Sequence, residues 1–392
     1  MKKEKFFLKT IEKYQFSFII LEVRGKVVNF KRINQILLGA IVISFVLLVI
    51  VGFEDYIKPF FAVADTNKTQ RITKSSSSSR QKETTSKRSK RKRQNFAEKS
   101  QADKDAAQLA DSGMMATYGL TFDYAHMTLP EVVTAYMDLQ GIDHSNIAFS
   151  YKDITTGKTY AMNDTQPMTA GSTYKLPLNM LVVDKVAKGK LSMTERFDIT
   201  NTTYEYKPEH DSYVAAFNGA MTIPEMQEYS LVYSENTPAY ALSERLGGMT
   251  KAYQKLDRYG KSKAKVKTIQ REGNKTTSDY YIQVLDYLWH HQKKYKDILY
   301  YIDQSFPGQY YETYLPSEIQ VYQKPGYVRE ALNIDAIVKE ENPYMVALYT
   351  RYLGGSDENS EEINPYGYNQ LAQVAYVINQ WHRVNMNGLK EN

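Results

Sequence analysis

The chain has 392 residues, enough for two domains or for one large domain with appendages, and its composition favours the second. It contains no cysteine, which excludes a disulfide framework, a thiolate metal site and a cysteine nucleophile. The formal net charge of +6 comes from the first 105 residues, because residues 106–392 hold 27 basic and 34 acidic side chains.

The N-terminal segment predicts a membrane anchor. Residues 1–35 form a basic tail, and residues 36–53 are 18 residues without a charge, about the minimum that spans a hydrocarbon core. Basic residues beside a first span stay in the cytoplasm. We therefore expect a single-pass protein with a cytoplasmic N-terminus and an extracellular C-terminal domain. The alternative is a signal peptide cleaved near Ala64, where the sequence has the small-x-small form of a cleavage site.

Residues 54–113 predict a disordered extracellular linker. The stretch 65–105 contains 13 basic and five acidic residues, a run of serines and too few apolar side chains to bury. Outside the membrane such a segment would attract anionic wall polymers or lipid headgroups. The alternative is a solvated spacer with no partner, and we expect no nucleic-acid partner. No nucleotide-binding glycine loop, zinc pattern or calcium-loop pattern occurs, so neither a cofactor nor a metal is expected.

Order is expected to return in residues 114–392. Thr128 and Glu131 form a capping box at the start of an amphipathic helix. Residues 147–151 and 158–162 are two short runs joined by the Gly-containing segment 153–157, which predicts a β-hairpin. A helix that is apolar almost all round follows Ser172 and ends near Gly189.

The second half of this region predicts a similar mixture of elements. A capping box at residues 222–225 opens a helix, and the turn Tyr233-Ser234-Glu235-Asn236 separates it from the next one. Three antiparallel strands and a closing helix end the chain. These elements predict one α+β domain in three layers, with terminal helices on one face of a five-stranded antiparallel sheet and a mostly helical subdomain on the other. The expected strands and last helix cover residues 319–324, 334–338, 344–349 and 371–381.

Ser172 and Lys175 are candidate catalytic residues. A spacing of three residues places both on one face of a helix, and Ser172 would lie at the helix N-terminus, where developing negative charge is favoured. A desolvated lysine can lose its proton near neutral pH and deprotonate the serine. The Ser-x-x-Lys pattern alone is weak evidence, because it also occurs in polar segments such as Ser262 to Lys265.

Three short motifs together carry a resemblance to a known family. Ser172-Thr173-Tyr174-Lys175, Ser234-Glu235-Asn236 and Lys324-Pro325-Gly326 resemble the Ser-x-x-Lys, Ser-Asp-Asn and Lys-Thr-Gly motifs of class A β-lactamases and penicillin-binding proteins. Their order matches, as do their contexts at a helix start, an interhelical turn and a strand. The resemblance spans residues 125–385, and it implies the class A β-lactamase-like fold.

The resemblance also implies a role for each residue. Ser172 would attack an amide carbonyl and form an acyl-enzyme, and Lys175 would activate it. Ser234 would pass a proton to the leaving nitrogen, while Lys324 would lower the pKa of that serine and attract an anionic substrate. The remaining roles concern substrate binding: Asn236 would hold the substrate's side-chain amide, Gly326 would leave room for the substrate along its strand, and the backbone N–H groups of Ser172 and Tyr327 would form the oxyanion hole. For Ser234 and Lys324 structural alternatives exist, a helix cap and a lysine that protects a sheet edge.

Two departures from the family pattern bear on the activity. Pro325 stands where the family has a hydroxyl that helps to bind the substrate carboxylate, and losing such a hydrogen bond costs about 1.5–3 kcal/mol. Glu235 replaces the aspartate of the second motif. The only candidate by position for the glutamate that activates the hydrolytic water is Glu272, in a much shortened loop, and its alternative is an exposed loop residue.

We therefore expect a membrane-anchored extracellular serine hydrolase on a Gram-positive-type surface. Its substrate would be a small β-lactam or a peptidoglycan-type amide. One alternative is an enzyme that resembles penicillin-binding proteins, whose serine is slowly acylated by D-Ala-D-Ala peptides. The other is a wall-associated binding protein that keeps the fold and has lost the reaction.

Overall fold

The computed structural model describes residues 96–202 and 206–391. The expected cytoplasmic tail (1–35), the expected transmembrane helix (36–53) and most of the expected linker (54–113) lie outside the described residues. Within the described part of the chain, no helix combines the length and the apolar character needed to cross a membrane.

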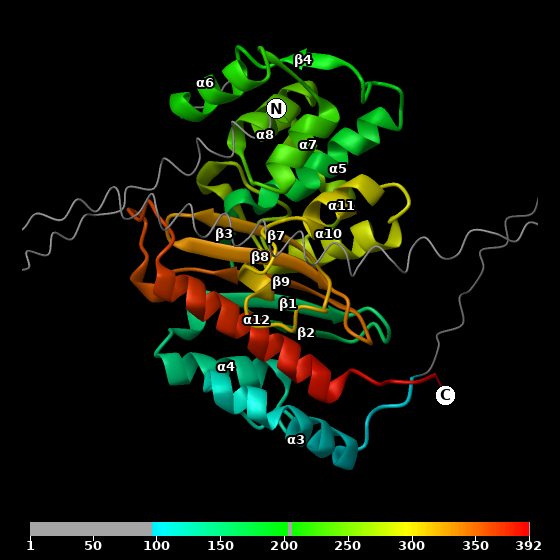
Figure 1. Ribbon diagram of the computed structural model, residues 1–392, viewed down its shortest axis with the longest axis vertical. Helices are drawn as coiled ribbons and strands as arrows, with labels where there is room; N and C mark the ends of the chain where they lie inside the picture. The colour runs from blue at the N-terminus through cyan, green and yellow to red at the C-terminus, as the bar shows by residue number, and fades with distance from the viewer. Residues whose placement is uncertain (1–95, 203–205, 392) are drawn as a thin grey trace, which may run out of the picture. The chain divides into compact units, whose positions relative to one another are not determined.

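A five-stranded antiparallel sheet forms the middle layer of the described domain (Figure 1). Its strand order is β2-β1-β9-β8-β7, so the N-terminal hairpin and the three C-terminal strands meet where β1 pairs with β9. The hairpin and all three C-terminal strands predicted from the sequence are confirmed. The bounds are β1 Ile147–Asp153, β2 Thr159–Met162, β7 Val321–Val328, β8 Ala331–Val338 and β9 Tyr344–Thr350.

Three helices cover one face of this sheet (Figure 1). They are α3 (Gln101–Tyr118), α4 (Leu129–Gln140) and α12 (Pro365–Asn385). The capping box at Thr128 and Glu131 is confirmed at the start of α4. Apolar side chains of α4 and α12 pack with those of the sheet into a single buried cluster, as the apolar periodicity of both helices predicts.

The boundary expected between linker and domain, at residue 113, is wrong, because α3 begins at Gln101. The Ser100 hydroxyl accepts the N–H of Asp103 and caps this helix. Asp111 on α3 pairs with Arg383 on α12, with 2.9 Å between Oδ2 and Nε. The composition of this segment predicts disorder, because it offers few apolar side chains to bury. In the structure only one α3 side chain, Met115, is fully buried. Polar contacts made far along the chain help to hold the helix.

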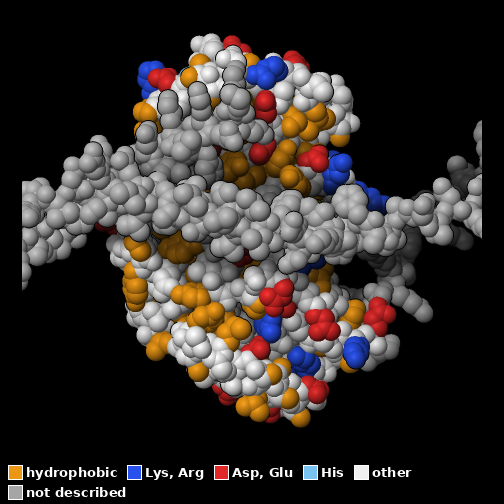
Figure 2. Space-filling view, viewed as in Figure 1, with side chains coloured by type: hydrophobic (Ala, Val, Ile, Leu, Met, Phe, Trp, Pro, Cys, Tyr) orange, Lys and Arg blue, Asp and Glu red, His pale blue; other side chains and the backbone are white. Residues whose placement is uncertain are grey.

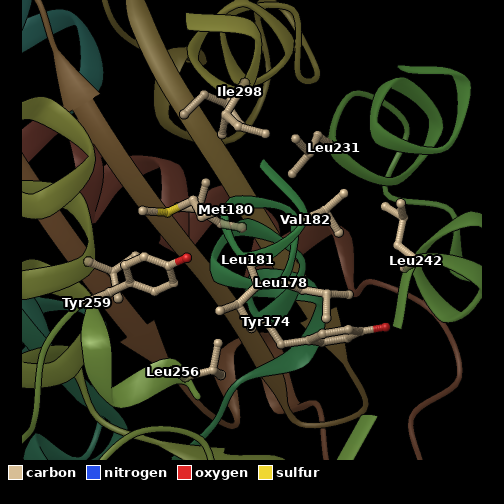
Figure 3. Close-up of a cluster of buried hydrophobic side chains, with 14 of the residues drawn as sticks. Tyr174, Leu178, Met180, Leu181, Val182, Leu231, Leu242, Leu256, Tyr259 and Ile298 are labelled. Carbon is tan, nitrogen blue, oxygen red and sulfur yellow. The ribbon is translucent and has the colours of Figure 1, made fainter. Parts of the chain in front are cut away.

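The opposite face of the sheet carries a helical subdomain built around α5 (Figure 1). Figure 3 shows side chains of α5, among them Met180 and Leu181, surrounded by apolar side chains of other segments, including Leu231 and Ile298. A helix buried all round is what its apolar sequence predicts. The helices of this layer that contribute several buried side chains are α5 (Lys175–Val186), α7 (Ile223–Leu231), α8 (Asn236–Arg245), α10 (Ser278–His290) and α11 (Lys296–Asp303).

Sequence reasoning missed several elements of this subdomain. The polar helix α6 has one buried side chain, Tyr213, so its pattern gives little signal. α11 spans eight residues and follows a lysine-rich turn. The remaining elements are α6 (Lys207–Ala216), α9 (Met249–Tyr253), and the paired short strands β3 (Met168–Thr169) with β6 (Lys275–Thr276) and β4 (Arg196–Asp198) with β5 (Ala220–Thr222).

The observed architecture confirms the predicted α+β fold in three layers. On the face drawn in Figure 2, acidic and basic side chains of the described residues are interspersed rather than gathered by sign. This distribution agrees with the nearly balanced charge of residues 106–392, where 27 basic side chains meet 34 acidic ones.

Candidate active site

Ser172 and Lys175 lie where a short 3-10 turn, η2 (Gly171–Tyr174), runs into α5. The Lys175 side chain is fully buried, and its Nζ donates to Ser172 Oγ at 3.0 Å. The predicted pair is therefore in contact. The buried surroundings of α5 hold the amine in this place, since the helix has no solvent-exposed face near its first turn.

Two more acceptors surround the Lys175 amine. One is the backbone carbonyl of Ser234, and the other is Oδ1 of Asn236 at 2.9 Å. Burial lowers the pKa of Lys175 to about 7, although the nearby carboxylates Glu209 and Glu235 act in the opposite direction. A lysine with this pKa is neutral in a large fraction of molecules at neutral pH. It can then take the proton of Ser172.

Ser234 lies in the turn between α7 and α8 in a left-handed backbone conformation, with φ of 60°. Non-glycine residues seldom adopt this conformation, and they do so more often at functional sites. Lys324 Nζ donates to Ser234 Oγ at 2.8 Å and to the carbonyl of Pro325 at 3.0 Å. Lys324 is fully buried, so the alternative of a solvent-facing lysine on a sheet edge is wrong.

Asp335 is an ionisable neighbour of Lys324 that the sequence did not reveal. It is opposite Lys324 in the β7–β8 register and is buried. The Tyr349 hydroxyl contacts its carboxyl group, at 3.1 Å from Oδ2. Burial and the positive charge of Lys175 hold the pKa of Lys324 well below its usual value, while Asp335 opposes that shift. Burial raises the pKa of Asp335 well above its usual value.

Gly326 makes room for η2, and its expected role in leaving space for a substrate stays a prediction. A Cβ at Gly326 would lie 2.7 Å from both the carbonyl oxygen of Ala170 and the backbone N of Thr173. A Cβ at Gly171, where φ is 58°, would lie 2.9 Å from the carbonyl carbon of Gly326. The two glycines therefore let η2 and β7 approach backbone to backbone.

The same contact brings the backbone N of Tyr327 to η2. A Cβ at Gly171 would lie 3.0 Å from this nitrogen. β7 is an edge strand. A proline in such a strand is tolerated where its nitrogen faces the free edge, because no sheet hydrogen bond is then lost, and we place the nitrogen of Pro325 on that side. Tyr327 follows Pro325 by two residues, so its N–H points to that same edge. This position suits the predicted oxyanion hole formed with the N–H of Ser172.

Comparison with known proteins identifies the family. A model described as "Beta-lactamase enzyme family" matches residues 132–376, more than half of the chain. The chain belongs to the β-lactamase enzyme family. The resemblance carried by the three motifs is thus confirmed at the level of the family. The comparison with curated proteins found no match.

Solved class A β-lactamases share the fold of this β-lactamase-family domain. The chain is similar to one described as the last common ancestor of Gram-negative bacteria, with 20% identity, a TM-score of 0.54, and coverage of 64% of this chain and 98% of the other. A β-lactamase from Xanthomonas campestris gives 17% identity, a TM-score of 0.52, and coverage of 64% and 97%. A mutant of the ancestral enzyme bound to 5(6)-nitrobenzotriazole gives 20% identity, a TM-score of 0.54, and coverage of 65% of this chain and 100% of the other. At these identities the likeness shows the fold.

A second residue of the β-lactamase-family site that sequence reasoning missed is Glu209 on α6. Its Oε1 accepts the backbone N–H groups of Asn236 at 2.9 Å and Thr237 at 2.6 Å. Its Oε2 accepts Nδ2 of Asn236 at 3.3 Å. The predicted substrate ligand Asn236 therefore lies between this carboxylate and Lys175. No sequence motif contains Glu209, because it is far in sequence from Asn236 and Lys175 and approaches them only in the folded domain.

Glu272 lies in the 3-10 turn η4 (Glu272–Asn274), and its side chain is exposed. The turn itself contacts the start of the site, because Asn274 accepts the N–H of Ala170 at 2.7 Å and its Nδ2 donates to the carbonyl of Gly171 at 3.3 Å. The role of Glu272 as a general base stays a prediction. Among the described residues, no group of three or more His, Cys, Asp or Glu side chains could hold a metal ion.

Proposed function

We propose that this domain is a membrane-anchored extracellular serine hydrolase that acts by acyl-serine chemistry on a β-lactam or a peptidoglycan-type amide. One observation carries the proposal. Two buried lysines each contact a serine hydroxyl at a single site, Lys175 at 3.0 Å from Ser172 Oγ and Lys324 at 2.8 Å from Ser234 Oγ. Family membership supports it, because β-lactamases are hydrolases of small amides.

Acylation begins when neutral Lys175 takes the proton of Ser172 and the Ser172 Oγ attacks the amide carbon. A C–O bond forms, and the carbonyl oxygen becomes an oxyanion. The N–H groups of Ser172 and Tyr327 stabilise that charge, and one such donor is typically worth a factor of about 10²–10³ in rate. The proton taken by Lys175 returns to the leaving nitrogen through the Ser234 hydroxyl, so that the C–N bond breaks and an ester remains on Ser172.

Lys324 would serve two steps of this reaction. Its amine contacts Ser234 Oγ directly and would favour proton transfer through that hydroxyl. In the protonated form it would also attract a carboxylate on the substrate. Pro325 offers no hydroxyl beside it, which removes one hydrogen bond to that carboxylate and weakens recognition roughly ten- to 150-fold.

A slow acylating enzyme that resembles penicillin-binding proteins is the second candidate, and the exposure of Glu272 favours it. Hydrolysis of the ester requires a base that contacts the attacking water. An exposed carboxylate is hydrated and less well placed to hold one water against the ester. If no other group replaces Glu272, the acyl-enzyme persists.

The proposed location comes from the N-terminal sequence. The apolar run 36–53 would anchor the chain, and the basic tail before it would remain in the cytoplasm. The basic linker would then lie against anionic wall polymers or lipid headgroups. Membrane fractionation together with protease protection of the C-terminal domain in intact cells tests this part of the proposal. Release of the full-length chain by high salt alone would contradict it.

The enzymatic proposal is tested with the full-length chain, a chromogenic cephalosporin and a fluorescent penicillin. Turnover that is lost in Ser172→Ala supports the hydrolase. Stable labelling at Ser172 without turnover supports the slow acylating enzyme. If neither turnover nor labelling occurs in folded protein, the chemistry is wrong and the fold serves as a wall-associated binding protein.

A further inference from the structure

Glu209 caps α8 from a different element of the fold. Its carboxylate accepts the N–H groups of Asn236 and Thr237, at 2.9 and 2.6 Å, in the first turn of that helix. Glu235, which precedes the helix and occupies its N-cap position, makes no side-chain cap hydrogen bond. A carboxylate at a helix N-terminus is favourable, because it accepts N–H groups that lack partners within the helix.

The same carboxylate fixes the orientation of the Asn236 amide. An ionised carboxylate only accepts hydrogen bonds, so the amide must turn Nδ2 toward it, and Nδ2 lies 3.3 Å from Glu209 Oε2. Oδ1 of Asn236 is consequently turned toward Lys175, whose Nζ donates to it at 2.9 Å. The chain of contacts therefore runs from Glu209 through Asn236 and Lys175 to the Ser172 hydroxyl, at 3.0 Å from the lysine.

Charged groups from three segments face Lys175. They are Glu209 on α6, Glu235 in the turn before α8, and Lys324 on β7. Of the two carboxylates, Glu209 has the stronger effect in raising the pKa of Lys175 against the lowering by burial. The charge of Glu209 and its hydrogen bonds thus act on the same amine.

We propose that Glu209 is a positioning residue for acylation, which orients the Asn236 amide so that its oxygen holds Lys175 against Ser172. This inference rests on the proposed function, because it assigns Lys175 the role of base. Glu209 contacts neither Ser172 nor the expected reacting atoms. Its effect passes through Asn236 and through its negative charge.

Glu209→Gln separates this role from simple capping. The glutamine oxygen can still accept the backbone N–H groups, but its amino group meets Nδ2 of Asn236 donor to donor. Turning the Asn236 amide places a donor against Lys175, and turning the glutamine amide places a donor against the backbone N–H groups of Asn236 and Thr237. We expect acylation of Ser172 by a fluorescent penicillin to slow roughly tenfold or more. We also expect its pH midpoint to fall, because one of the two carboxylates that favour protonated Lys175 is gone.

A compensating change makes the test reciprocal. In Glu209→Gln combined with Asn236→Asp, the glutamine donates to the new carboxylate, whose other oxygen accepts from Lys175. The negative charge beside Lys175 is restored, so the pH midpoint of acylation should recover toward the wild-type value; the absolute rate need not recover, because Asn236 is also the expected substrate ligand. Glu228→Gln, which removes an exposed carboxylate on α7, is the matched control and should change neither.

The outcome for Glu209 can be separated from that for the enzyme. If wild-type Ser172 is labelled and Glu209→Gln changes only thermal stability, Glu209 is a cap and the inference fails while the function stands. If wild-type Ser172 is not labelled, the function fails. An NMR titration of ¹³C-labelled lysine, with the Lys175 signal assigned by its loss in Lys175→Met, then decides the inference. A Lys175 midpoint that is equal in the wild type and in Glu209→Gln overturns it.

Discussion

The pH dependence of acylation follows from the burial of Lys175. Only the neutral amine can accept the proton of Ser172, and burial lowers the pKa of Lys175 to about 7. Acylation should therefore be maximal above pH 7 and should decrease as the pH falls. At pH 5, about two units below this pKa, roughly one molecule in a hundred has a neutral lysine, so the rate should be about 100-fold lower. Rapid-mixing measurements of fluorescent penicillin labelling at Ser172, from pH 5 to 9, provide the assay.

Substitutions at Lys175 and Glu235 identify the titrating group. Lys175→Arg keeps a cation that stays protonated at every working pH, so the base is lost and acylation should fall by about 10²–10⁴. Lys152→Arg is the matched control, because Lys152 is ion-paired with Asp286 at 2.6 Å, away from the site. Burial and Glu209 raise the pKa of Glu235 to about 7, in the same range. An acid limb that survives in Glu235→Gln belongs to the lysine.

Two results would refute this reasoning. A rate that is level from pH 5 to 9 would show that no group of pKa near 7 is needed for acylation. A rate that rises only toward pH 10 would show that Lys175 keeps the pKa of an exposed amine, about 10.4. In that case the amine is hydrated, and the buried contact with Ser172 does not describe the working enzyme.

Three further substitutions test other parts of the site. Ser234→Ala should slow fluorescent penicillin labelling by about 10²–10⁴ by removing the proton path to the leaving nitrogen, and an unchanged rate would exclude that path. Gly326→Ala should destabilise the domain by about 1–3 kcal/mol in urea unfolding, because its Cβ would meet backbone atoms of Ala170 and Thr173 at 2.7 Å. Gly113→Ala, with open space around it, is the control and should not destabilise. Pro325→Thr should raise the second-order labelling rate about tenfold by supplying a hydroxyl for the substrate carboxylate, whereas no gain would mean that this carboxylate is bound elsewhere.

The parts of the fold that the sequence predicted are those with strong local patterns. The capping box before α4, the two short runs and glycine-containing turn of the β1–β2 hairpin and the apolar run of α5 each occur within a short window of sequence. Four of the five catalytic candidates were found because three motifs, each weak alone, occur together in a set order, whereas Glu272 was proposed by position only. Local patterning and motif order were enough to place Ser172, Lys175, Ser234 and Lys324.

The residues that the sequence did not reveal depend on contacts between distant segments. Glu209 is 34 residues from Lys175 and 27 from Asn236, on a helix with a single buried side chain. Asp335 lies opposite Lys324 in the strand pairing, and its position follows only from the β7–β8 register. Likewise, α3 has the composition of a linker. Its ion pair with Arg383, on the last helix of the domain, is a contact between distant segments that the local sequence does not show. Such partners become visible only when the topology is known.

The dry surroundings of the two lysines connect the architecture to the chemistry. Removing an ammonium group from water is costly, and the cost is smaller for the neutral amine, so burial favours the basic form that the reaction needs. The close contact of Gly171 with Gly326 brings β7 against η2, and this brings Lys324 and Lys175 close enough for their charges to interact. Two neighbouring ammonium groups disfavour each other, so a carboxylate that binds Lys324 and keeps it protonated would also favour neutral Lys175. In the proposed reaction, substrate binding and activation of the nucleophile would thereby be coupled through the charges of the two lysines.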